Sequence, residues 1–509
     1  MTTNGDTNGV SSRKAIETRL FINNEVNTIT YSSGFAKSQD QYVRSKSGQT
    51  ITVKNPVDDS VVTSEVQVAG PADVDSAVAA ARAAFKSGPW KSFSGPQRAV
   101  CMNKLADLIE VNLDELCRLE SIAMGQPIIV AKTFIGLSIL QWRYYAGFAD
   151  KIGGDMFPED GDGTYKLVRY EPLGVCAGIS AWNGTHVFIC WKCAPAVATG
   201  NTIIFKSSEK SPLGALAMGK LVVEAGFPPG VINFISGGGE TGHLLASHMD
   251  INKISFTGSV QSGRKVQQAA TNSNLKRVTL ELGGKSPSLI FNDADMDMAL
   301  TQASQGFLTN SGQICAAASR IFVQEGIAPK FIEALKEKFE HFVHAMGDPL
   351  APNTFLGPLA DQIQFDRVMA FLEQGKKDAQ VLTGGGRHGN KGNFIEPTIF
   401  LDPPKESKIY TDEIFGPVLV VKTFKTEEEV VELANDTSYG LAAYLYTSDI
   451  TRALRVSANL EAGSVFINGP FMPTINTPFG GLKQSGNGGR ESGKHGLMSY
   501  LEPKSILIK

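Results

Sequence analysis

The feature that most constrains the fold is a regular alternation of short apolar runs and helical segments between residues 175 and 281. The apolar runs are Val175–Ser180, Thr202–Phe205, Val231–Ile235, Lys253–Thr257 and Arg277–Glu281. The segments between them have helical character, at His186–Ala198, Pro212–Ala225, Thr241–Ser247 and Ser262–Ala270. Because crossovers between parallel strands are right-handed, this alternation predicts a doubly wound parallel sheet, with ligands bound at the carboxyl ends of its strands.

The chain on either side of this region is expected to add further elements. Before it, strands are expected at Leu20–Val26 and Ile51–Asn55, and helices at Pro71–Phe85, with Asp73 as the cap, and at Gln97–Cys117. Residues 1–18 are polar and predicted to be disordered, and part of the polar segment 28–49 is predicted to be an inserted surface loop. A second α/β domain is expected after it, with helices and strands at Pro329–Phe342, Asp361–Gln374, Pro417–Phe424, Ala443–Tyr446 and Ser464–Ile467.

A turn cluster at residues 159–163 separates two strand-like runs, 154–157 and 165–169, and indicates a long exposed hairpin. The last residues, Ser505–Lys509, form a further strand that can extend a sheet with this hairpin. An exposed strand pair needs a cover, and a partner subunit is a plausible one. We therefore predict four parts: a first α/β domain at 19–153 and 173–282, a second α/β domain at 283–486, a flap of hairpin and tail at 154–172 and 487–509, and the tail at 1–18.

The bulk composition excludes several classes of partner. The chain has 509 residues and a formal net charge of -3, so no strong field exists to attract nucleic acid or an anionic membrane. No run of about eighteen apolar residues is present to cross a bilayer. Six cysteines at irregular spacings fit a reducing compartment, and the polar N-terminus has no apolar signal segment. The cytoplasm is the expected location.

Two residues carry the chemistry that we expect. Glu281 ends an apolar strand just before Gly283-Gly284, and Cys315 lies among small residues in Ser311-Gly312-Gln313-Ile314-Cys315. An accessible thiol can act as a nucleophile, and a carboxylate beside a glycine turn can act as a general base. Taken alone, a cysteine such as Cys315 is more often simply packed in the interior, and a glutamate such as Glu281 is more often exposed to solvent.

The motifs ELGGKSP, from Glu281, and SGQIC, from Ser311, resemble the two signatures of the aldehyde dehydrogenase superfamily, and the similarity extends from about Leu20 to Lys509. The resemblance implies that family's fold, with a Rossmann-type cofactor domain, a second α/β catalytic domain and a small β flap that pairs between subunits as a homodimer or homotetramer. It implies NAD-dependent oxidation of an aldehyde to a carboxylic acid. It also matches Trp182-Asn183 to the family's Trp-Asn pair, which makes Asn183 and the Cys315 backbone N–H the oxyanion donors.

The resemblance also implies a set of residues around NAD. Lys206 and Glu209 follow the second apolar run and match the residues that bind the adenosine ribose, where a carboxylate favours NAD over NADP. Gly258, Ser259 and Gly263 match the nucleotide-binding turn at a helix start. Glu413 and Phe415 match the residues at the nicotinamide ribose and ring. From the sequence alone, Lys206 and Glu209 could instead form a surface ion pair. The segment from Gly258 to Gly263 could be an ordinary helix start, and Phe415 could be an ordinary core residue.

The run Gly237-Gly238-Gly239-Glu240-Thr241-Gly242 satisfies the dinucleotide motif G-x-G-x-x-G between a strand and a helix. No acidic residue follows at the expected distance, and the strand is third in its series rather than first. A tight turn that allows close packing is an equal alternative. The resemblance places Gly237 at the border of the cofactor. Cys190 and Cys193 share a helix face and are expected to pack, and we expect no metal site.

The expected reaction starts with attack of the Cys315 thiolate on the aldehyde carbon, so the site is expected to favour the thiolate. Hydride then leaves, and Glu281 activates the water that hydrolyses the thioester. Glu281 argues against an acylating semialdehyde dehydrogenase. Retention of the whole residue set disfavours a non-catalytic binding protein, and no histidine motif pairs with Cys315 as a cysteine hydrolase requires.

The sequence departs from the family pattern next to Asn183. Ala181 replaces the usual proline, and Gly184-Thr185-His186 replaces a bulky apolar helix start that lines the substrate tunnel in relatives. Gly488-Gly489 adds a glycine before Arg490-Glu491. The small-molecule substrate is therefore expected to be a larger or more polar aldehyde than a simple alkanal.

Overall fold

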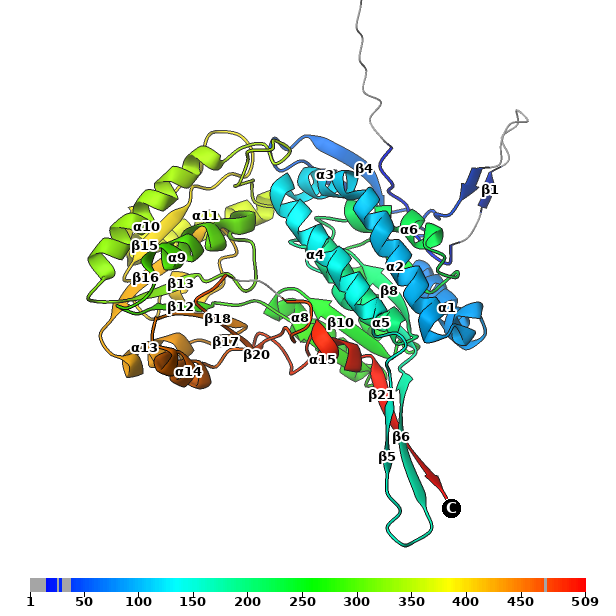
Figure 1. The fold of residues 1–509 in the computed structure, drawn as a ribbon. Helices are drawn as coiled ribbons and strands as arrows, with labels where there is room; N and C mark the ends of the chain where they lie inside the picture. The colour runs from blue at the N-terminus through cyan, green and yellow to red at the C-terminus, as the bar shows by residue number, and fades with distance from the viewer. Residues whose placement is uncertain (1–14, 25–26, 30–37, 471–473) are drawn as a thin grey trace, which may run out of the picture.

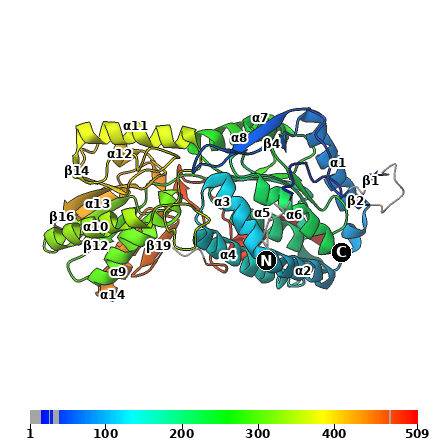
Figure 2. The same ribbon diagram turned by 90° about the horizontal axis from the view of Figure 1, so that it is seen from above.

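The computed structural model of this chain describes residues 15–24, 27–29, 38–470 and 474–509, so most of the predicted disordered tail lies outside it. The described residues form two lobes that lie side by side, with a narrow β hairpin projecting from one of them (Figure 1). Seen from above, the helices α1 to α8 belong to one lobe and α9 to α14 to the other (Figure 2). No helix in these ranges is long and apolar enough to span a membrane.

The first lobe contains the predicted doubly wound sheet. Its five parallel strands are β7 (Val175–Ile179), β8 (Thr202–Lys206), β9 (Ile232–Ile235), β10 (Lys253–Thr257) and β11 (Arg277–Glu281). The connecting helices are α5 (Thr185–Ala198), α6 (Leu213–Glu224), α7 (Gly239–Ser247) and α8 (Val260–Asn272). The alternation of apolar runs therefore predicted the right elements, and the α/β fold class is confirmed.

The strand order β11-β10-β7-β8-β9 contains a switch point beside β7. The chain runs outward from β7 to β9 and then returns to β10 on the other side of β7. Connections on the two sides of the switch point diverge, which opens a crevice at the carboxyl ends of the strands. The loops that begin at residues 180, 207, 236, 258 and 282 all start at this end of the sheet.

The segment before this sheet differs in three places from the sequence expectations. Asp73 is not the cap of α1 (Pro71–Lys86); it lies at the third helical position and accepts a hydrogen bond from the Gly70 N–H at 3.0 Å. The helix expected at Gln97–Cys117 is two helices that meet at Asn112. These and the following long helix are α2 (Gly95–Val111), α3 (Leu113–Met124) and α4 (Ile128–Ala146).

The strand expected at Leu20–Val26 is the third difference. Only isolated bridges occur in its described part, and at Phe21 the backbone exchanges two hydrogen bonds of 2.9 Å with Phe234 at the edge of the sheet. The short strands around it are β1 (Asn27–Ile29), β2 (Ser38–Asp40), β3 (Thr50–Lys54) and β4 (Val61–Gln67). The segment predicted as an inserted loop is thus partly strand, because β1 pairs with β2, and its residues 30–37 lie outside the described part.

The second lobe is built on a seven-stranded sheet of order β14-β15-β16-β13-β12-β18-β19, in which only β14 is antiparallel. Its strands are β12 (Pro287–Ile290), β13 (Arg320–Gln324), β14 (Gln380–Thr383), β15 (Thr398–Leu401), β16 (Val418–Phe424), β18 (Ala442–Tyr446) and β19 (Ser464–Ile467). Its helices are α9 (Met296–Thr301), α10 (Ala328–Phe342), α11 (Gln362–Asp378), α12 (Lys408–Thr411), α13 (Glu427–Asn435) and α14 (Ile450–Asn459).

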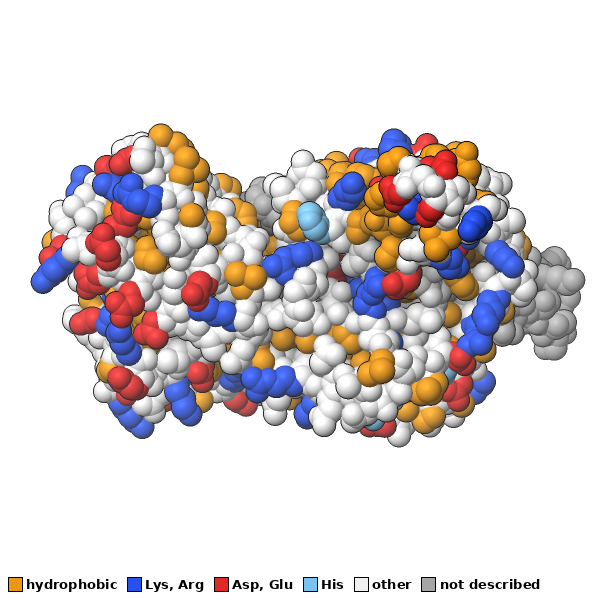
Figure 3. Space-filling view, turned by 90° about the horizontal axis from the view of Figure 1, so that it is seen from below, with side chains coloured by type: hydrophobic (Ala, Val, Ile, Leu, Met, Phe, Trp, Pro, Cys, Tyr) orange, Lys and Arg blue, Asp and Glu red, His pale blue; other side chains and the backbone are white. Residues whose placement is uncertain are grey.

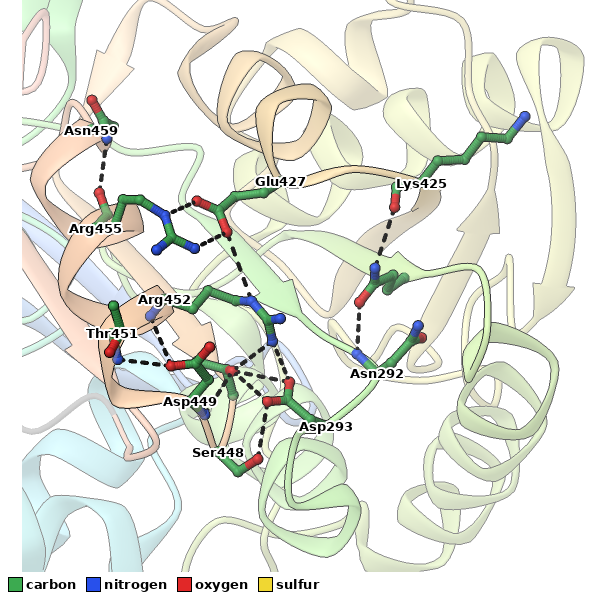
Figure 4. A network of polar contacts seen from close by, with 12 residues as sticks. Asn292, Asp293, Lys425, Glu427, Ser448, Asp449, Thr451, Arg452, Arg455 and Asn459 are labelled. Atoms are coloured by element: carbon green, nitrogen blue, oxygen red, sulfur yellow. Dashed lines mark hydrogen bonds and ion pairs between the residues drawn. The ribbon is translucent and has the colours of Figure 1, made fainter.

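A network of charges ties α13 and α14 to the loop that follows β12 (Figure 4). Arg452 binds Asp293 at 2.8 Å, and Arg455 binds Glu427 at 2.7 Å through two parallel bonds. Single exposed ion pairs contribute little to stability, but a bidentate arginine within a network holds a defined geometry. This network joins the segments that follow the interior strands β12, β16 and β18 of the second sheet.

The projecting hairpin consists of β5 (Gly154–Phe157) and β6 (Tyr165–Pro172), and β21 (Leu501–Ile508) adds a third antiparallel strand along β6. The tail strand expected at Ser505–Lys509 therefore does extend the hairpin sheet. Apolar side chains gather around the hairpin on the face seen from below (Figure 3), and Met156 is 69% exposed. The short helix α15 (Gly493–Met498) precedes β21.

Candidate active site

Cys315 follows a backbone segment that a regular helix cannot provide. Asn310, Ser311 and Gly312 have φ values of 56°, 55° and 71°, all in the left-handed region. Such a conformation persists only where its surroundings hold it. Here the Ser311 hydroxyl donates to the Gly357 carbonyl at 2.7 Å, and a Cβ on Gly312 would overlap the Gly416 carbonyl oxygen. The thiol is thereby placed, half-buried, in the wall of a cavity.

Asn183 lines the same cavity from the other lobe, at the end of the loop after β7. Its side-chain amide donates one hydrogen bond of 2.9 Å to the carbonyl of Gln313, two residues before Cys315. An amide nitrogen carries two protons, so a second donor remains beside the thiol. The structure therefore brings these two predicted residues together, and the hydrogen bond fixes the amide.

Glu281 is the last residue of β11 and is buried, with 2% of its surface exposed. Neither carboxylate oxygen has a hydrogen-bond partner among the described residues. A buried carboxylate without partners costs free energy unless it is protonated, and burial raises its pKa well above the usual value. The charge of Glu491 adds to this effect. Such a group takes up protons at neutral pH more readily than an exposed glutamate.

The electrostatics of Cys315 differ from the expectation. Burial, followed by the charges of Glu413 and Glu281, raises the pKa of the Cys315 thiol to about 12. The prediction that the site favours the thiolate is wrong for the protein by itself. The physical reason is first the burial of the thiol and then the two acidic residues, Glu413 and Glu281, whose charges act on it. Glu413 is itself buried, which raises its pKa to about 7, and it accepts a hydrogen bond of 3.1 Å from the Gly284 N–H.

This finding predicts the reactivity of Cys315 in the free protein. With a pKa of about 12 the thiol stays protonated at neutral pH, so alkylation by iodoacetamide at pH 7 is expected to be about 10³-fold slower than for a free cysteine. The rate is expected to rise about tenfold per pH unit up to pH 10. Mass spectrometry of the Cys315 peptide measures this rate separately from the other, buried cysteines. A plateau near pH 8 would contradict the prediction.

The predicted cofactor residues lie along the carboxyl edge of the first sheet. The Lys206 ammonium lies 3.8 Å from a carboxylate oxygen of Glu209, with Lys206 buried and Glu209 half-exposed. Ser259 caps α8 and accepts from the Ser262 N–H at 3.2 Å, and Gly258 precedes it. A small residue at a helix start leaves backbone N–H groups for an anion.

At two of the predicted glycines, close packing leaves no room for a side chain. A Cβ on Gly237 would overlap the Thr241 hydroxyl, and the residue has a φ of 153°. A Cβ on Gly263 would lie 2.6 Å from a methyl group of Leu282. The G-x-G-x-x-G match therefore lies in a tight turn, which was the alternative to a pyrophosphate cradle.

Several buried polar atoms at this edge have no partner within the described residues, among them Trp182 Nε1 and Ser207 Oγ. Trp182 is fixed on two sides: its ring packs edge-on against Phe415 at 5.4 Å, and the Lys210 ammonium lies 4.1 Å from the ring centre. Buried donors are normally satisfied, so unused ones mark a place for a polar ligand. Together with the anion-binding start of α8, these groups fit a dinucleotide.

The comparison with known proteins decides the family. The model of the aldehyde dehydrogenase family matches residues 42–506. The chain belongs to the aldehyde dehydrogenase family. An aldehyde dehydrogenase of Emericella nidulans is 47% identical over 489 residues, covering 96% of this chain and 94% of its own, and mouse aldehyde dehydrogenase 1A1 is 43% identical over 502 residues, covering 97% and 96%.

Solved structures of this family agree with the fold. The NAD+ complex of an aldehyde dehydrogenase from Bacillus cereus has a TM-score of 0.91 and 41% identity, covering 97% of this chain and 96% of its own. The expectation of an aldehyde-oxidising enzyme of this family is thus confirmed at the level of family and fold. The roles of the individual residues remain predictions.

The sequence did not reveal a buried ion pair beneath the site of this family member. The Lys192 ammonium donates to the Glu491 carboxylate at 2.9 Å, and both residues are buried. Ser255 also donates to Glu491. The only signals were a lysine within an apolar helix and the Arg490-Glu491 pair after the glycine motif, and neither indicated a contact. Because the charge of Glu491 raises the pKa of Glu281, this pair helps to set the protonation of the predicted base.

A second contact that the sequence did not reveal joins the two lobes. The Lys210 ammonium, which lies over Trp182, also binds the Asp361 carboxylate at 2.9 Å. Asp361 caps α11 in the second lobe, and Gln364 in the same helix donates to the Phe415 carbonyl at 2.8 Å. The two sides of the crevice are therefore held in register around Trp182 and Phe415.

Proposed function

We propose that this chain oxidises an aldehyde to the carboxylic acid with NAD as the hydride acceptor, through a covalent bond to Cys315. The observation that supports the proposal is that Cys315 and Asn183 line one cavity, while the charges of Glu413 and Glu281 act on the Cys315 thiol. A nucleophile, an amide donor and a buried base are the three functions that this chemistry requires.

The residues act in sequence. The Cys315 thiol gives up its proton to solvent, its sulfur attacks the carbonyl carbon to form a C–S bond, and the carbonyl electron pair moves to oxygen. The second N–H of Asn183 and the backbone N–H of Cys315 donate to this oxyanion. When the C=O bond forms again, the C–H electron pair leaves as hydride and a thioester remains on Cys315. NAD, when bound, supplies the acceptor of this hydride.

Glu281 completes the reaction. Its carboxylate takes a proton from a water molecule, the hydroxyl oxygen attacks the thioester carbon, and the C–S bond breaks with sulfur as the leaving group. The sum is aldehyde, NAD+ and water converted to carboxylic acid and NADH with release of protons. An acylating enzyme sends the thioester to another acceptor, so a buried base without a partner supports hydrolysis.

The cofactor residues are proposed from the same edge of the sheet. Lys206 and Glu209 would hold the hydroxyls of the adenosine ribose, and Glu209 would repel a 2′-phosphate, which favours NAD. Trp182, with its unpartnered indole N–H, and Gly258 and Ser259, just before α8, would face the pyrophosphate. Glu413 and Phe415 would lie at the nicotinamide ribose and ring. Gly237 and Gly263 would shape the turns that border this site.

The outer sheet supports an oligomer. The outer strands of the hairpin sheet, β5 and β21, each pair with β6 on one side only among the described residues, and Met156, Phe157 and Leu507 are exposed. Exposed apolar strand edges are usually covered, so we propose a homodimer or homotetramer that forms through this sheet. Sedimentation velocity measures the state directly. Location in the cytoplasm stays a prediction.

The oxyanion role of Asn183 gives a direct test. Replacing Asn183 with alanine removes a donor and is expected to lower kcat by about 10²–10³-fold, with KM for NAD unchanged within about threefold. Formation of NADH from NAD and an aldehyde is the measurement. Asn459→Ala, at an exposed position in α14, is the matched control and is expected to keep full kcat. A variant Asn183→Ala with full kcat would remove the amide from the mechanism.

A further inference from the structure

The cavity in front of Cys315 is far larger than a small aldehyde needs. Its volume is about 360 Å³, within the range of about 300–1,000 Å³ that takes drug-sized ligands. A two-carbon aldehyde would leave most of this space to water, which an apolar cavity holds poorly. The cavity therefore fits a substrate with a large group behind the aldehyde carbon.

Aromatic side chains make up much of its wall. Trp191 packs against Phe479 with ring centres 5.0 Å apart and against Phe188 at 6.1 Å. The two tyrosines in the wall have their hydroxyls engaged, because Tyr444 donates to the Ala316 carbonyl and Tyr446 to the Gly469 carbonyl. These tyrosines consequently present ring carbon, and not hydroxyl groups, to the substrate.

None of the described residues that line the cavity is an aspartate, glutamate, lysine, arginine or histidine. A carboxylate on the substrate would have no cation to pair with there, and an ammonium group would have no anion. Moving such a charge out of water without a partner is expensive. The lining therefore selects an uncharged substrate. Two of its polar residues, Thr301 and Gln305, are exposed and lie on α9 and on the single turn of π-helix (Gln302–Gly306) that follows it.

One residue holds the cavity open on the side of Asn183. Gly184 starts the loop into α5, and a Cβ built on it would lie 3.7 Å from Phe188 and 3.8 Å from Phe134. A methyl group fits at these distances, but any larger side chain would occupy the space between the two rings. The φ of Gly184 is −167°, outside the left-handed region that favours glycine, and the feature that a larger residue would remove is the open space beside the two rings.

We propose that the substrates of this enzyme are uncharged aryl aldehydes, and that Gly184 is the residue that sets this preference. The aryl ring would lie between Phe134 and Phe188, with the aldehyde carbon at Cys315. Aromatic rings favour offset or edge-on packing with centres about 4.5–7 Å apart. In the wall of the cavity Trp191 already packs edge-on against Phe188 and tilted against Phe479. The inference rests on the proposed function, because it assigns the substrate of the same site.

The first experiment compares kcat/KM of the wild-type holoenzyme for 2-naphthaldehyde, acetaldehyde, succinic semialdehyde and betaine aldehyde, with NAD saturating. We expect 2-naphthaldehyde to exceed acetaldehyde by about 10²-fold, which corresponds to burial of roughly 110 Å² of ring surface at about 25 cal/mol per Å². A preference for acetaldehyde, for the anionic semialdehyde or for the cationic betaine aldehyde overturns the inference while aldehyde oxidation itself stands. Absence of NADH from every aldehyde, with NAD still bound, contradicts the proposed function instead.

The second experiment tests Gly184. In Gly184→Phe the ratio of kcat/KM for 2-naphthaldehyde to that for acetaldehyde is expected to fall on the order of 30-fold, because the new ring fills the aryl site. Gly184→Ala is the matched control, and its ratio is expected to stay within about threefold of wild type. Equal ratios in all three proteins would remove Gly184 as the determinant.

A third measurement needs no variant and covers the case in which Gly184→Phe does not fold, which circular dichroism and NAD binding would report. Inhibition of the wild-type enzyme by 2-naphthoate, competitive with the aldehyde, is expected to be about 10²-fold stronger than inhibition by acetate. Equal inhibition by the two acids would show that the cavity gives an aryl ring no advantage.

Discussion

Replacing Cys315 with alanine is expected to lower aldehyde-dependent formation of NADH by about 10⁴-fold or more. The reason is that no C–S bond can form, and no other described cysteine is available, because the remaining five are buried. Binding of NAD should be retained within about threefold, since Cys315 lies in the aldehyde cavity. NADH formation is followed by absorbance and NAD binding by titration calorimetry.

Cys101→Ala is the matched control for this change. Cys101 lies in α2, where its thiol donates to the Gly226 carbonyl at 3.4 Å, outside the cavity and the cofactor edge. It is expected to keep full activity. Undiminished turnover in Cys315→Ala would falsify the covalent mechanism and, with it, the proposed function. Loss of activity together with NAD binding would instead indicate a misfolded variant, and the thermal midpoint distinguishes the two outcomes.

Replacing Glu281 with glutamine is expected to separate the two halves of the reaction. Removing the base leaves hydride release intact, so one NADH per site should form in a rapid burst before turnover slows by about 10²–10⁴-fold. Rapid-mixing absorbance measures the burst, and mass spectrometry measures the acyl group on Cys315. The exposed carboxylate Glu240 on α7 provides a control substitution, Glu240→Gln, with unchanged kinetics.

The pH dependence of turnover is an independent test of Glu281 as the general base. The base acts only when it is deprotonated, and burial raises the pKa of Glu281 well above its usual value. Hydrolysis of the thioester in the wild type should therefore accelerate as the pH rises through this elevated pKa. In Glu281→Gln this rise of the rate with pH should disappear. A burst that vanishes along with steady-state turnover would place Glu281 before the thioester instead.

Which secondary-structure elements could be predicted from the sequence depends on the local pattern that each one leaves in it. The strands β7 to β11 were found because buried parallel strands are continuous apolar runs between turn residues. The strands β12 to β15 of the second sheet were not found, although β12 directly follows the ELGGKSP motif. The helix break at Asn112 was missed because helical periodicity continues across it. Local pattern reports the type of an element better than its ends.

At the candidate site, residues in sequence motifs were predicted, but contacts between residues distant in the sequence were not. Cys315, Glu281 and Asn183 were found from motifs, and the structure places Cys315 and Asn183 on one cavity. The buried pair Lys192–Glu491 had no sequence signal, because its members are 299 residues apart and only folding brings them together. Lys210 and Asp361, which join the lobes, are separated by 151 residues and were missed for the same reason.

The sequence by itself determined the fold class and the family, and it predicted the nucleophile and the base, because these depend on residue type and on spacing along the chain. Only the tertiary structure decided the protonation of the site and the shape of the cavity. A pKa depends on burial and on charges that come from remote segments, which is why burial, followed by the charges of Glu413 and Glu281, reversed the expectation for Cys315. The open space beside Gly184 likewise exists only because Phe134 and Phe188, from different helices, leave it unfilled.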